Sequence, residues 1–300
     1  MESPPTRAVL LVNDKSRRGK EWFAQAETDL RAAGVELVTA RKFRTVTELI
    51  RIADSSIKSG VPMVVAGGGD GTFSAIIHLF VNQPTVLGVL PLGTGNAFAR
   101  DLEIPFNVQG AVNILTSGHV LPVDIATIDD DYFVNVATVG LTTKIADALT
   151  NDAKRKYGRM VYLFALARAL GQASAFRARL TLDDMEHEFE TLQIVVGNGR
   201  YHAGPFRLSP EAGIRDGRLT MYALQTTSKS AFIKLAVRLA SGTQRNLGEV
   251  FGAEFREGRL ETTPTKRVTV DGEVGLRTPI HFSCRPAAVR VVVARSADLT

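Results

Sequence analysis

The chain of 300 residues has a single cysteine, Cys284. One cysteine excludes an internal disulfide framework and a cysteine-rich zinc site, and it is typical of a protein in a reducing compartment. The five histidines show no spacing typical of metal ligands. The first residues lack the apolar core of a signal peptide, and no run of about 18 uncharged apolar residues occurs. We therefore predict a cytoplasmic protein without a membrane-spanning helix.

The chain also lacks a long block of one charge. Its formal net charge of +5 favours an anionic partner, such as a nucleotide or an acidic membrane surface. Because the basic residues are scattered and no nucleic-acid-binding motif accompanies them, no nucleic-acid partner is predicted. Hydrophobic residues make up 45% of the chain, which supports a sizeable core, and the length suits two domains.

Short, continuous apolar runs alternate with helical patterns from the N-terminus to about Ser117. The predicted strands are Ala8–Val12, Val35–Thr39, Met63–Ala66 and Val86–Leu90. The predicted helices are Trp22–Leu30, Thr47–Ile57, the stretch after Gly71, Ala97–Leu102 and Val108–Leu115. Such alternation is typical of a parallel sheet with helices on both faces. We predict a Rossmann-like α/β nucleotide-binding domain over residues 1–122, with the tail 293–300 as a candidate addition.

After Pro122, alternating apolar and polar residues replace the continuous runs. The predicted strands are Val123–Ile128, Tyr132–Ala137, Arg177–Leu182, Phe189–Val196, Leu219–Leu224, Val268–Val270 and Val289–Val293. Helical patterns interrupt them at Gly158–Gly171 and Ser230–Leu239. This pattern predicts a mainly antiparallel β-sandwich domain over residues 123–292, with a cleft between it and the first domain.

Two glycine-rich turns each follow an apolar strand and precede a helical pattern. The first reads Gly67-Gly68-Gly69-Asp70-Gly71-Thr72, and the second reads Gly93-Thr94-Gly95-Asn96. Glycine lets a ligand approach the bare backbone, and the free N–H groups of a helix N-terminus bind anions. Because the carboxyl ends of parallel strands share one edge of a sheet, the two turns together predict a phosphate site. Asp70 beside a phosphate requires a metal ion or a reacting proton between the two anions.

These motifs resemble the diacylglycerol kinase catalytic-domain superfamily of lipid kinases, which includes sphingosine kinases. The first turn matches its nucleotide signature, and Pro91–Asn96 with Phe98-Ala99-Arg100 matches its next motif. The likeness continues, in order, through Tyr132–Asn135, Asn198-Gly199, Pro210, Asp216-Gly217 and Asp271-Gly272-Glu273. The chain is most similar to the soluble bacterial members.

The resemblance implies an ATP- and Mg²⁺-dependent kinase that phosphorylates a lipid hydroxyl. The implied nucleotide contacts are Asn13, Lys15, Ser16, Arg17, Thr45, Gly68, Gly69, Asp70, Gly71, Thr72 and Thr94. Catalytic positions are Asp70, Asn96, Asp124 and Asp271, with Glu273 as general base. A magnesium site is implied at Asp216 with the carbonyl groups of Gly213 and Arg218. A lipid acceptor further implies peripheral contact with a membrane surface, and a homodimer is left open.

Two readings of Asp271 and Glu273 remain open. Residues two apart in a strand project to one face, which would direct both carboxylates at the acceptor hydroxyl. Alternatively, Asp-Gly is a strong hairpin-turn dipeptide, in which case the pair lies at a bend.

The chain departs from the family pattern at several positions near the predicted site. In the first loop, Asp14 and Arg17 alter a segment that is expected to face phosphate. Ala97 stands where an acid commonly follows Asn96, and Arg215 replaces an acid before Asp216, which weakens the magnesium prediction.

Competing functions are an NAD kinase-like or sugar-phosphate kinase, because these use a similar glycine turn, and an inactive lipid- or nucleotide-binding regulator. The Asn-Glu pair typical of NAD kinases is absent after Asp70. A dehydrogenase is disfavoured because neither turn has the Gly-x-Gly-x-x-Gly pattern with an acid about 20 residues later.

Overall fold

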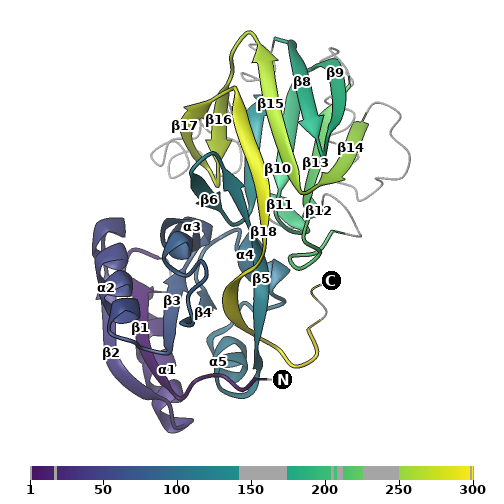
Figure 1. Cartoon of the computed structure of the whole chain (residues 1–300). Helices are drawn as coiled ribbons and strands as arrows, with labels where there is room; N and C mark the ends of the chain where they lie inside the picture. Colours follow the sequence, from purple (N-terminus) through teal and green to yellow (C-terminus); the bar gives the residue numbers. More distant parts are fainter. Residues whose placement is uncertain are drawn as a thin grey trace.

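The computed structural model describes residues 2–16, 19–141, 174–203, 206–207, 212–225, 250–297 and 299. Its N-terminal part is built on four parallel strands in the spatial order β2-β1-β3-β4 (Figure 1). These strands are β1 (Arg7–Asn13), β2 (Glu36–Phe43), β3 (Met63–Gly68) and β4 (Val86–Pro91). The interior strands β3 and β4 are buried along their whole length, as a sheet covered on both faces requires.

Helices cover both faces of this parallel sheet. They are α1 (Gly19–Ala32), α2 (Val46–Lys58), α3 (Asp70–Ile76) with the 3₁₀ turn η1 (Ile77–Leu79), α4 (Ala97–Asp101) and α5 (Val108–Ser117). Helix α1 packs beside α5, and α2 packs beside α3. β2 lies on one side of β1 and β3 on the other, so the connections from β1 to β2 and from β2 to β3 run in opposite directions across the sheet. Because both crossovers are right-handed, the α1–α5 pair and the α2–α3 pair lie on opposite faces.

Two long strands connect this part to the second half. β18 (Ile280–Val293) pairs in parallel with β4 through Val291 and Leu87, and antiparallel with β5 (His119–Ile128) along most of its length. The same β18 then pairs with β15 (Glu257–Thr263) of the second half. Figure 1 shows β18 and β5 running side by side from one half of the molecule into the other. The two halves therefore share a continuous sheet.

The second half is a sandwich of two antiparallel layers. One layer extends the shared sheet through β15, β8 (Phe176–Leu182) and β9 (Met185–Thr191), with β6 (Asp131–Phe133) paired to β5. The other layer runs in the order β14-β13-β10-β7-β16-β17. Its strands are β7 (Val136–Gly140), β10 (Gln193–Gly197), β13 (Leu219–Leu224), β14 (Val250–Phe255), β16 (Arg267–Val270) and β17 (Glu273–Arg277). A short hairpin joins β11 (Tyr201–Ala203) and β12 (Phe206–Arg207).

Each half has its own buried hydrophobic cluster. The first fills the α/β part and includes Phe73, Phe98 and the strands β1, β3 and β4. The second lies between the two sandwich layers and includes Phe133 and Phe255. Within the described residues, no helix combines the length and the apolar character that spanning a membrane requires.

The predicted fold class is confirmed, with a parallel α/β part and a mainly antiparallel sandwich. The strands β14, β15 and β17 were missed, and in β15 and β17 the apolar residues are too sparse for the alternation to stand out. The helices predicted at Gly158–Gly171 and Ser230–Leu239 lie outside the described residues. The predicted domain boundary falls inside the unbroken strand β5, and the division 1–122 and 123–292 stays a prediction.

Two predicted strands are each split in two, so these predictions were wrong. Tyr132–Ala137 divides at Val134 and Asn135, whose N–H groups donate to the carboxylate of Asp271 instead of to a neighbouring strand. Phe189–Val196 divides at Leu192, where the chain leaves β9 in one layer for β10 in the other. The hydroxyl of Thr191 bonds the backbone of Gln193 at that corner.

Candidate active site

The two glycine turns contact each other directly. β3 and β4 are parallel neighbours with Gly68 opposite Pro91, so both turns begin at the same edge of the sheet. The N–H of Leu92 donates to the carbonyl of Gly68 at 2.7 Å. A Cβ on Gly93 would lie 2.5 Å from the Cα of Gly69, which is too close for any side chain. These glycines are therefore required by the approach of one turn to the other.

Gly71 differs from the other glycines of the site. It is exposed at the start of α3, and a Cβ placed on it would meet no atom within 4 Å. The protein itself does not need a glycine here, whereas a Cβ on Gly68 would lie 2.1 Å from the hydroxyl of Thr72. Absence of a side chain at an exposed helix start leaves room for a ligand against the backbone.

Asp70 lies between the two turns. The N–H of Phe98 donates to its Oδ1 at 3.2 Å, and the N–H groups of Asn96 and Ala97 also interact with the carboxyl. The carboxylate therefore accepts from the free N–H groups at the N-terminus of α4, a position where helices bind anions. Burial raises the pKa of Asp70, and the backbone donors counteract part of that shift.

Asn96 holds the second turn in shape. It has a left-handed backbone with φ of 49°. Its Oδ1 accepts from the N–H of Gly93 at 2.8 Å, and its Nδ2 donates to the carbonyl of Gly93 at 2.9 Å. Both ends of this buried amide are engaged inside the turn, so Asn96 shapes the loop that exposes Thr94.

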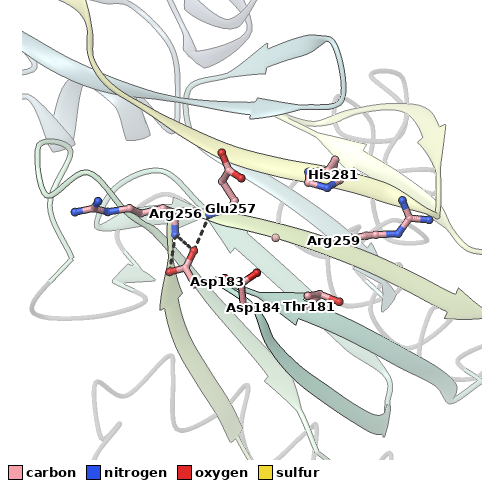
Figure 2. A pocket seen from close by; sticks show the side chains of 8 residues that line it. Thr181, Asp183, Asp184, Arg256, Glu257, Arg259 and His281 are labelled. Carbon is pink, nitrogen blue, oxygen red and sulfur yellow. Dashed lines mark hydrogen bonds between the residues drawn. The ribbon is translucent and has the colours of Figure 1, made fainter.

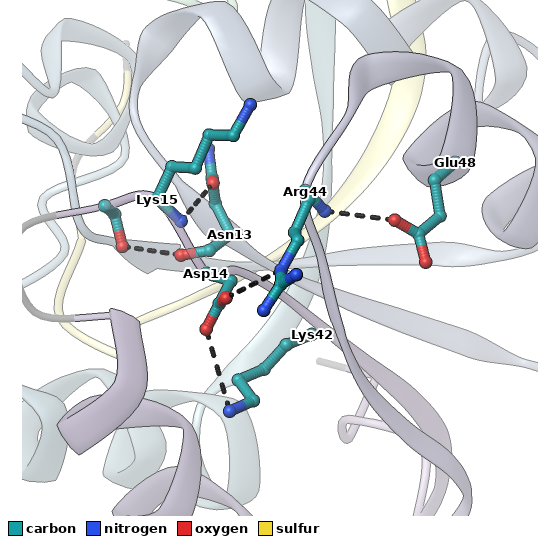
Figure 3. Close-up of polar contacts among 7 residues, drawn as sticks. Asn13, Asp14, Lys15, Lys42, Arg44 and Glu48 are labelled. Atoms are coloured by element: carbon teal, nitrogen blue, oxygen red, sulfur yellow. Dashed lines mark hydrogen bonds and ion pairs between the residues drawn. The ribbon is translucent and has the colours of Figure 1, made fainter.

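The first loop lies at the carboxyl ends of β1 and β2 (Figure 3). Asn13 Oδ1 accepts from the N–H of Lys15 at 2.9 Å, and the Ser16 hydroxyl donates to the Asn13 carbonyl at 2.8 Å. Asp14 pairs with Arg44 at 3.1 Å and with Lys42 at 3.6 Å, and therefore gathers two cations beside the loop. Arg17 lies outside the described residues.

Thr45 forms the N-cap of α2. Its hydroxyl oxygen accepts from the N–H of Glu48 at 3.2 Å, and Glu48 in turn accepts from the N–H of Arg44 at 3.0 Å. Thr45 therefore caps the first turn of α2, and Glu48 holds the residue that precedes the cap. Because the Thr45 oxygen is the acceptor in this bond, its hydrogen is available to a ligand.

Asp271 and Gly272 form a two-residue hairpin turn between β16 and β17. Both have positive φ values, 47° and 93°, and Val270 pairs with Glu273 across the turn. Those angles are typical of a type I′ turn, which an Asp-Gly dipeptide favours. The expectation that Asp271 and Glu273 share one strand face is therefore wrong, because the chain reverses direction at Asp271. Glu273 is exposed at the first position of β17.

The Asp271 carboxylate is fully engaged by the protein. Its oxygens accept from the N–H groups of Val134 at 2.9 Å, Asn135 at 3.0 Å and Val136 at 2.9 Å. The nearby hydroxyl of Ser74 in α3 further favours the ionised carboxylate. Burial raises the pKa of Asp271, and these donors oppose that shift. The geometry gives Asp271 a bracing role and leaves Glu273 as the exposed carboxylate of the hairpin.

Asp124 and Asp216 are also bonded to backbone. Asp124 accepts from the N–H groups of Gly217 and Ala287, both at 2.7 Å, and burial raises its pKa. Asp216 accepts from the N–H groups of Gly213 and Arg218, both at 2.8 Å. All four carboxylate oxygens thus already hold donors.

The donor set around Asp216 does not fit a divalent cation well. Arg215 lies close enough to act electrostatically on Asp124, and its Nε donates to the carbonyl of Pro122 at 3.0 Å. Within the part of the chain that the structure describes, no group of three His, Cys, Asp or Glu side chains could hold a metal. The prediction of Asp216, Gly213 and Arg218 as magnesium ligands stays a prediction.

The sequence did not single out Asp101 and Arg200, which join the two halves near the site. The buried Asp101 at the end of α4 accepts from the N–H of Arg200 at 2.8 Å. A Cβ on Gly199 would lie 2.6 Å from its carboxylate, so the glycine is needed there. No local pattern marks such residues, because their partners are distant in sequence.

A pocket of about 530 Å³ lies in the sandwich, apart from the glycine turns (Figure 2). Its lining comes from the end of β8, the β8–β9 turn and the first residues of β15 and β18: Thr181, Asp183, Asp184, Arg256, Glu257, Gly258, Arg259 and His281. None of the predicted site residues lines it.

Comparison with known families matches nearly the whole chain in two parts. Residues 7–128 match the diacylglycerol kinase catalytic domain. Residues 135–293 match the YegS C-terminal NAD kinase beta sandwich-like domain.

Individual relatives and solved structures are similar over nearly the whole chain as well. A diacylglycerol kinase of Staphylococcus epidermidis is 28% identical over 282 residues, which are 92% of this chain and 88% of the relative. One from Staphylococcus aureus is 27% identical over 92% of this chain and 89% of its own length. A solved structure from Bacillus anthracis has a TM-score of 0.83 at 24% identity, covering 97% of this chain and 99% of that chain. A second, described as a diacylglycerol kinase of that organism, has a TM-score of 0.77 at 22% identity, covering 98% of each chain.

Proposed function

We propose a specific lipid kinase reaction for this chain. The chain belongs to the family that combines a diacylglycerol kinase catalytic domain with a YegS-type C-terminal domain. The γ-phosphoryl group of ATP is transferred to the hydroxyl of a diacylglycerol-like lipid. The observation that carries this proposal is the pair of glycine turns in direct contact at one sheet edge, with Gly71 and Thr94 exposed on them.

The donor half of the site consists of three loops at the carboxyl ends of β1, β3 and β4. The exposed backbone at Gly71 and the hydroxyl of Thr94 suit phosphate oxygens. Asn13 to Ser16 and the free hydrogen of Thr45 extend this surface towards β2. Lys42 and Arg44, gathered by Asp14, add positive charge beside the triphosphate.

Asp70 is suited to a magnesium ion that arrives with the nucleotide. Mg²⁺ in kinases is typically held by one or two carboxylates together with substrate phosphates, and Asp70 is the carboxylate at the junction of the two turns. When bound, the ion neutralises charge on the phosphates. Asp70 positions it, and the backbone donors of α4 keep the carboxylate oriented.

Glu273 is the group that we assign to the acceptor hydroxyl. It is exposed, and it stands next to a turn that Asp271 anchors through several hydrogen bonds. Phosphoryl transfer depends mainly on positioning and charge, and a carboxylate at the hydroxyl orients it and takes its proton as the new P–O bond forms. The lipid is reached at a membrane surface, because its chains remain in the bilayer.

The test is a transfer assay with radiolabelled ATP on mixed vesicles that contain diacylglycerol, with NAD as a second acceptor. Labelled phosphatidic acid with no labelled NADP supports the proposal. Labelled NADP alone indicates an NAD kinase, which the type of sandwich makes a reasonable control. Nucleotide binding without transfer to either acceptor indicates a regulator and overturns the proposal.

A further inference from the structure

The guanidinium group of Arg100 is held at the second glycine turn by two contacts. Arg100 lies in the last turn of α4, and its side chain runs back towards the start of the helix, as helical side chains do. Its Nε donates to the carbonyl of Gly95 at 3.3 Å. The guanidinium carbon lies 4.4 Å from the centre of the Phe106 ring. Because a free arginine side chain samples many rotamers, these two contacts restrict where its charge stands.

Arg100 is not paired with an acid of the protein. In the part of the chain that the structure describes, no carboxylate forms an ion pair with it. Asp101 and Glu103, the acids nearest in sequence, contact Arg200 instead, through its backbone N–H at 2.8 Å and its guanidinium group at 3.9 Å. Arg100 is half-buried, and a guanidinium group in such a place is well suited to an anionic ligand.

This cation lies beside the groups that the proposed function assigns to ATP. Gly95, which accepts from Arg100, directly follows the exposed Thr94. A Cβ on Gly95 would lie 3.0 Å from Oδ2 of Asp70. α4 also packs against β11 of the sandwich half, and Figure 1 shows α4 where the two halves meet. A phosphate group bound at Thr94 or beside Asp70 therefore has this guanidinium group as a neighbour.

Phe106 is exposed, although it is a large apolar residue. It lies in the connection between α4 and α5, just before the N-cap Asn107, and 37% of its surface is accessible. The face of an aromatic ring carries partial negative charge, which attracts a cation and on which the planar guanidinium group stacks. The contact with Arg100 gives a ring at this position a role that burial does not.

We propose that Phe106 is a positioning residue that holds Arg100 in place for the phosphate groups of the nucleotide, an inference that rests on the proposed function for the identity of that nucleotide. The ring keeps the side chain of Arg100 in the orientation that its bond to the Gly95 carbonyl also requires. A cation that is already oriented binds more tightly, because less conformational entropy is lost when the ligand arrives. The bound phosphate then accepts a charge-assisted hydrogen bond from Arg100.

The first test measures the affinity of the full chain for ATP by calorimetric titration. Phe106→Leu keeps an apolar side chain but removes the aromatic face, whereas the matched control Phe106→Tyr keeps the ring. We expect Phe106→Leu to bind ATP about 3- to 5-fold more weakly, the usual size of a cation–π contact, and Phe106→Tyr to stay within about 1.5-fold of the wild type. Because the residue is exposed, the melting temperatures should be similar. Equal affinities of the wild type and Phe106→Leu for ATP overturn the proposal.

A double-mutant cycle separates this positioning role from a general effect on the loop. Arg100→Ala is expected to weaken ATP binding about 10-fold, because a charged partner of the phosphates is lost. Adding Phe106→Leu to Arg100→Ala should cause no further loss, since Phe106 acts through Arg100. Losses that add up in the double variant show that Phe106 acts by another route and overturn the proposal.

The same variants distinguish this inference from the proposed function, because ATP binding is measured without lipid. Non-additive losses of ATP affinity in a protein that phosphorylates no lipid mean that the lipid kinase assignment fails and the positioning role stands. Lipid phosphorylation by the wild type, together with additive losses or with unchanged ATP affinity in Phe106→Leu, refutes the positioning role and leaves the kinase assignment intact.

Discussion

Backbone N–H groups hold the carboxylates of both halves, but the surroundings of these carboxylates differ. In the α/β half, Asp70 lies between two glycine turns and interacts with the N-terminus of a short helix next to open backbone at Gly71. In the sandwich half, Asp124, Asp216 and Asp271 each accept at least two backbone N–H groups. Under the proposed function, the open backbone at Gly71 faces an anionic ligand, whereas the acids of the sandwich half brace loops. Glu273 is the exception there, because it is exposed.

The largest effect is expected where a carboxylate serves the reaction. Glu273→Gln should lower kcat by about 100-fold or more, because the amide cannot take a proton. Its affinity for ATP and its melting temperature should match the wild type, since Glu273 is exposed. Steady-state transfer assays and calorimetric titration with ATP measure these quantities. Full activity in this variant would show that another group takes the proton.

Asp271→Asn should instead act on stability. An amide has one acceptor oxygen, whereas the carboxylate accepts from three backbone N–H groups, so at least one buried donor loses its partner. We expect a loss of about 1–3 kcal/mol in the free energy of unfolding, the usual cost of an unsatisfied buried group. Urea denaturation checks it, with Asp216→Asn in the more exposed loop as a comparison. An unchanged unfolding midpoint contradicts the bracing role.

Gly93 and Gly71 are predicted to differ in their roles within the α/β half, one in folding and the other in ligand binding. Gly93→Ala places a Cβ against the Cα of Gly69 and should destabilise the turn. Gly71→Ala meets no protein atom and should leave the fold intact, with a helix start stabilised by up to about 1 kcal/mol. We expect it to weaken ATP binding about 10-fold, because the methyl group occupies ligand space. Thermal unfolding and ATP titration separate the two effects. Normal ATP affinity in Gly71→Ala means that no ligand approaches there.

The pH dependence of stability tests Asp70 as a buried acid. Burial raises the pKa of Asp70 in the folded state above 3.8. At pH values between 3.8 and this raised pKa, the folded state binds a proton that the unfolded state has released. This contribution to the free energy of unfolding therefore falls as pH rises from about 4 through the raised pKa. Asp70→Asn cannot ionise, so its stability relative to wild type should increase across that window while transfer is lost. Parallel unfolding curves from pH 4 to 8 would contradict this.

The smallest effect is expected from magnesium at the Asp216 loop. Since its carboxylates hold backbone donors and Arg215 supplies a positive charge, the melting temperature without nucleotide should be the same in EDTA and in millimolar Mg²⁺. Arg215→Asp removes that charge and adds a ligand, and it should make the melting temperature rise with Mg²⁺. A clear Mg²⁺-dependent rise in the melting temperature of the wild type would instead support the predicted metal site at Asp216.

Local patterns were sufficient for much of the fold and for the meeting of the two glycine turns at one sheet edge. Strands such as β3 and β4 are continuous apolar runs followed by glycine-rich turns, and α2 begins at the N-cap Thr45, so their elements follow from neighbours in the chain. Glycine, aspartate and threonine at two consecutive strand ends also predicted a phosphate site, because parallel strands end at a common edge.

Tertiary structure alone decided how each acid is used. Aspartate is held by backbone N–H groups beside the two glycine turns at position 70 and by three backbone N–H groups at a hairpin turn at position 271. The split of Tyr132–Ala137 and the bond from Asp101 to Arg200 both involve segments far apart in the chain. Periodicity and turn preferences act over a few residues, whereas the state of a buried carboxylate depends on whichever donors the folded chain brings to it.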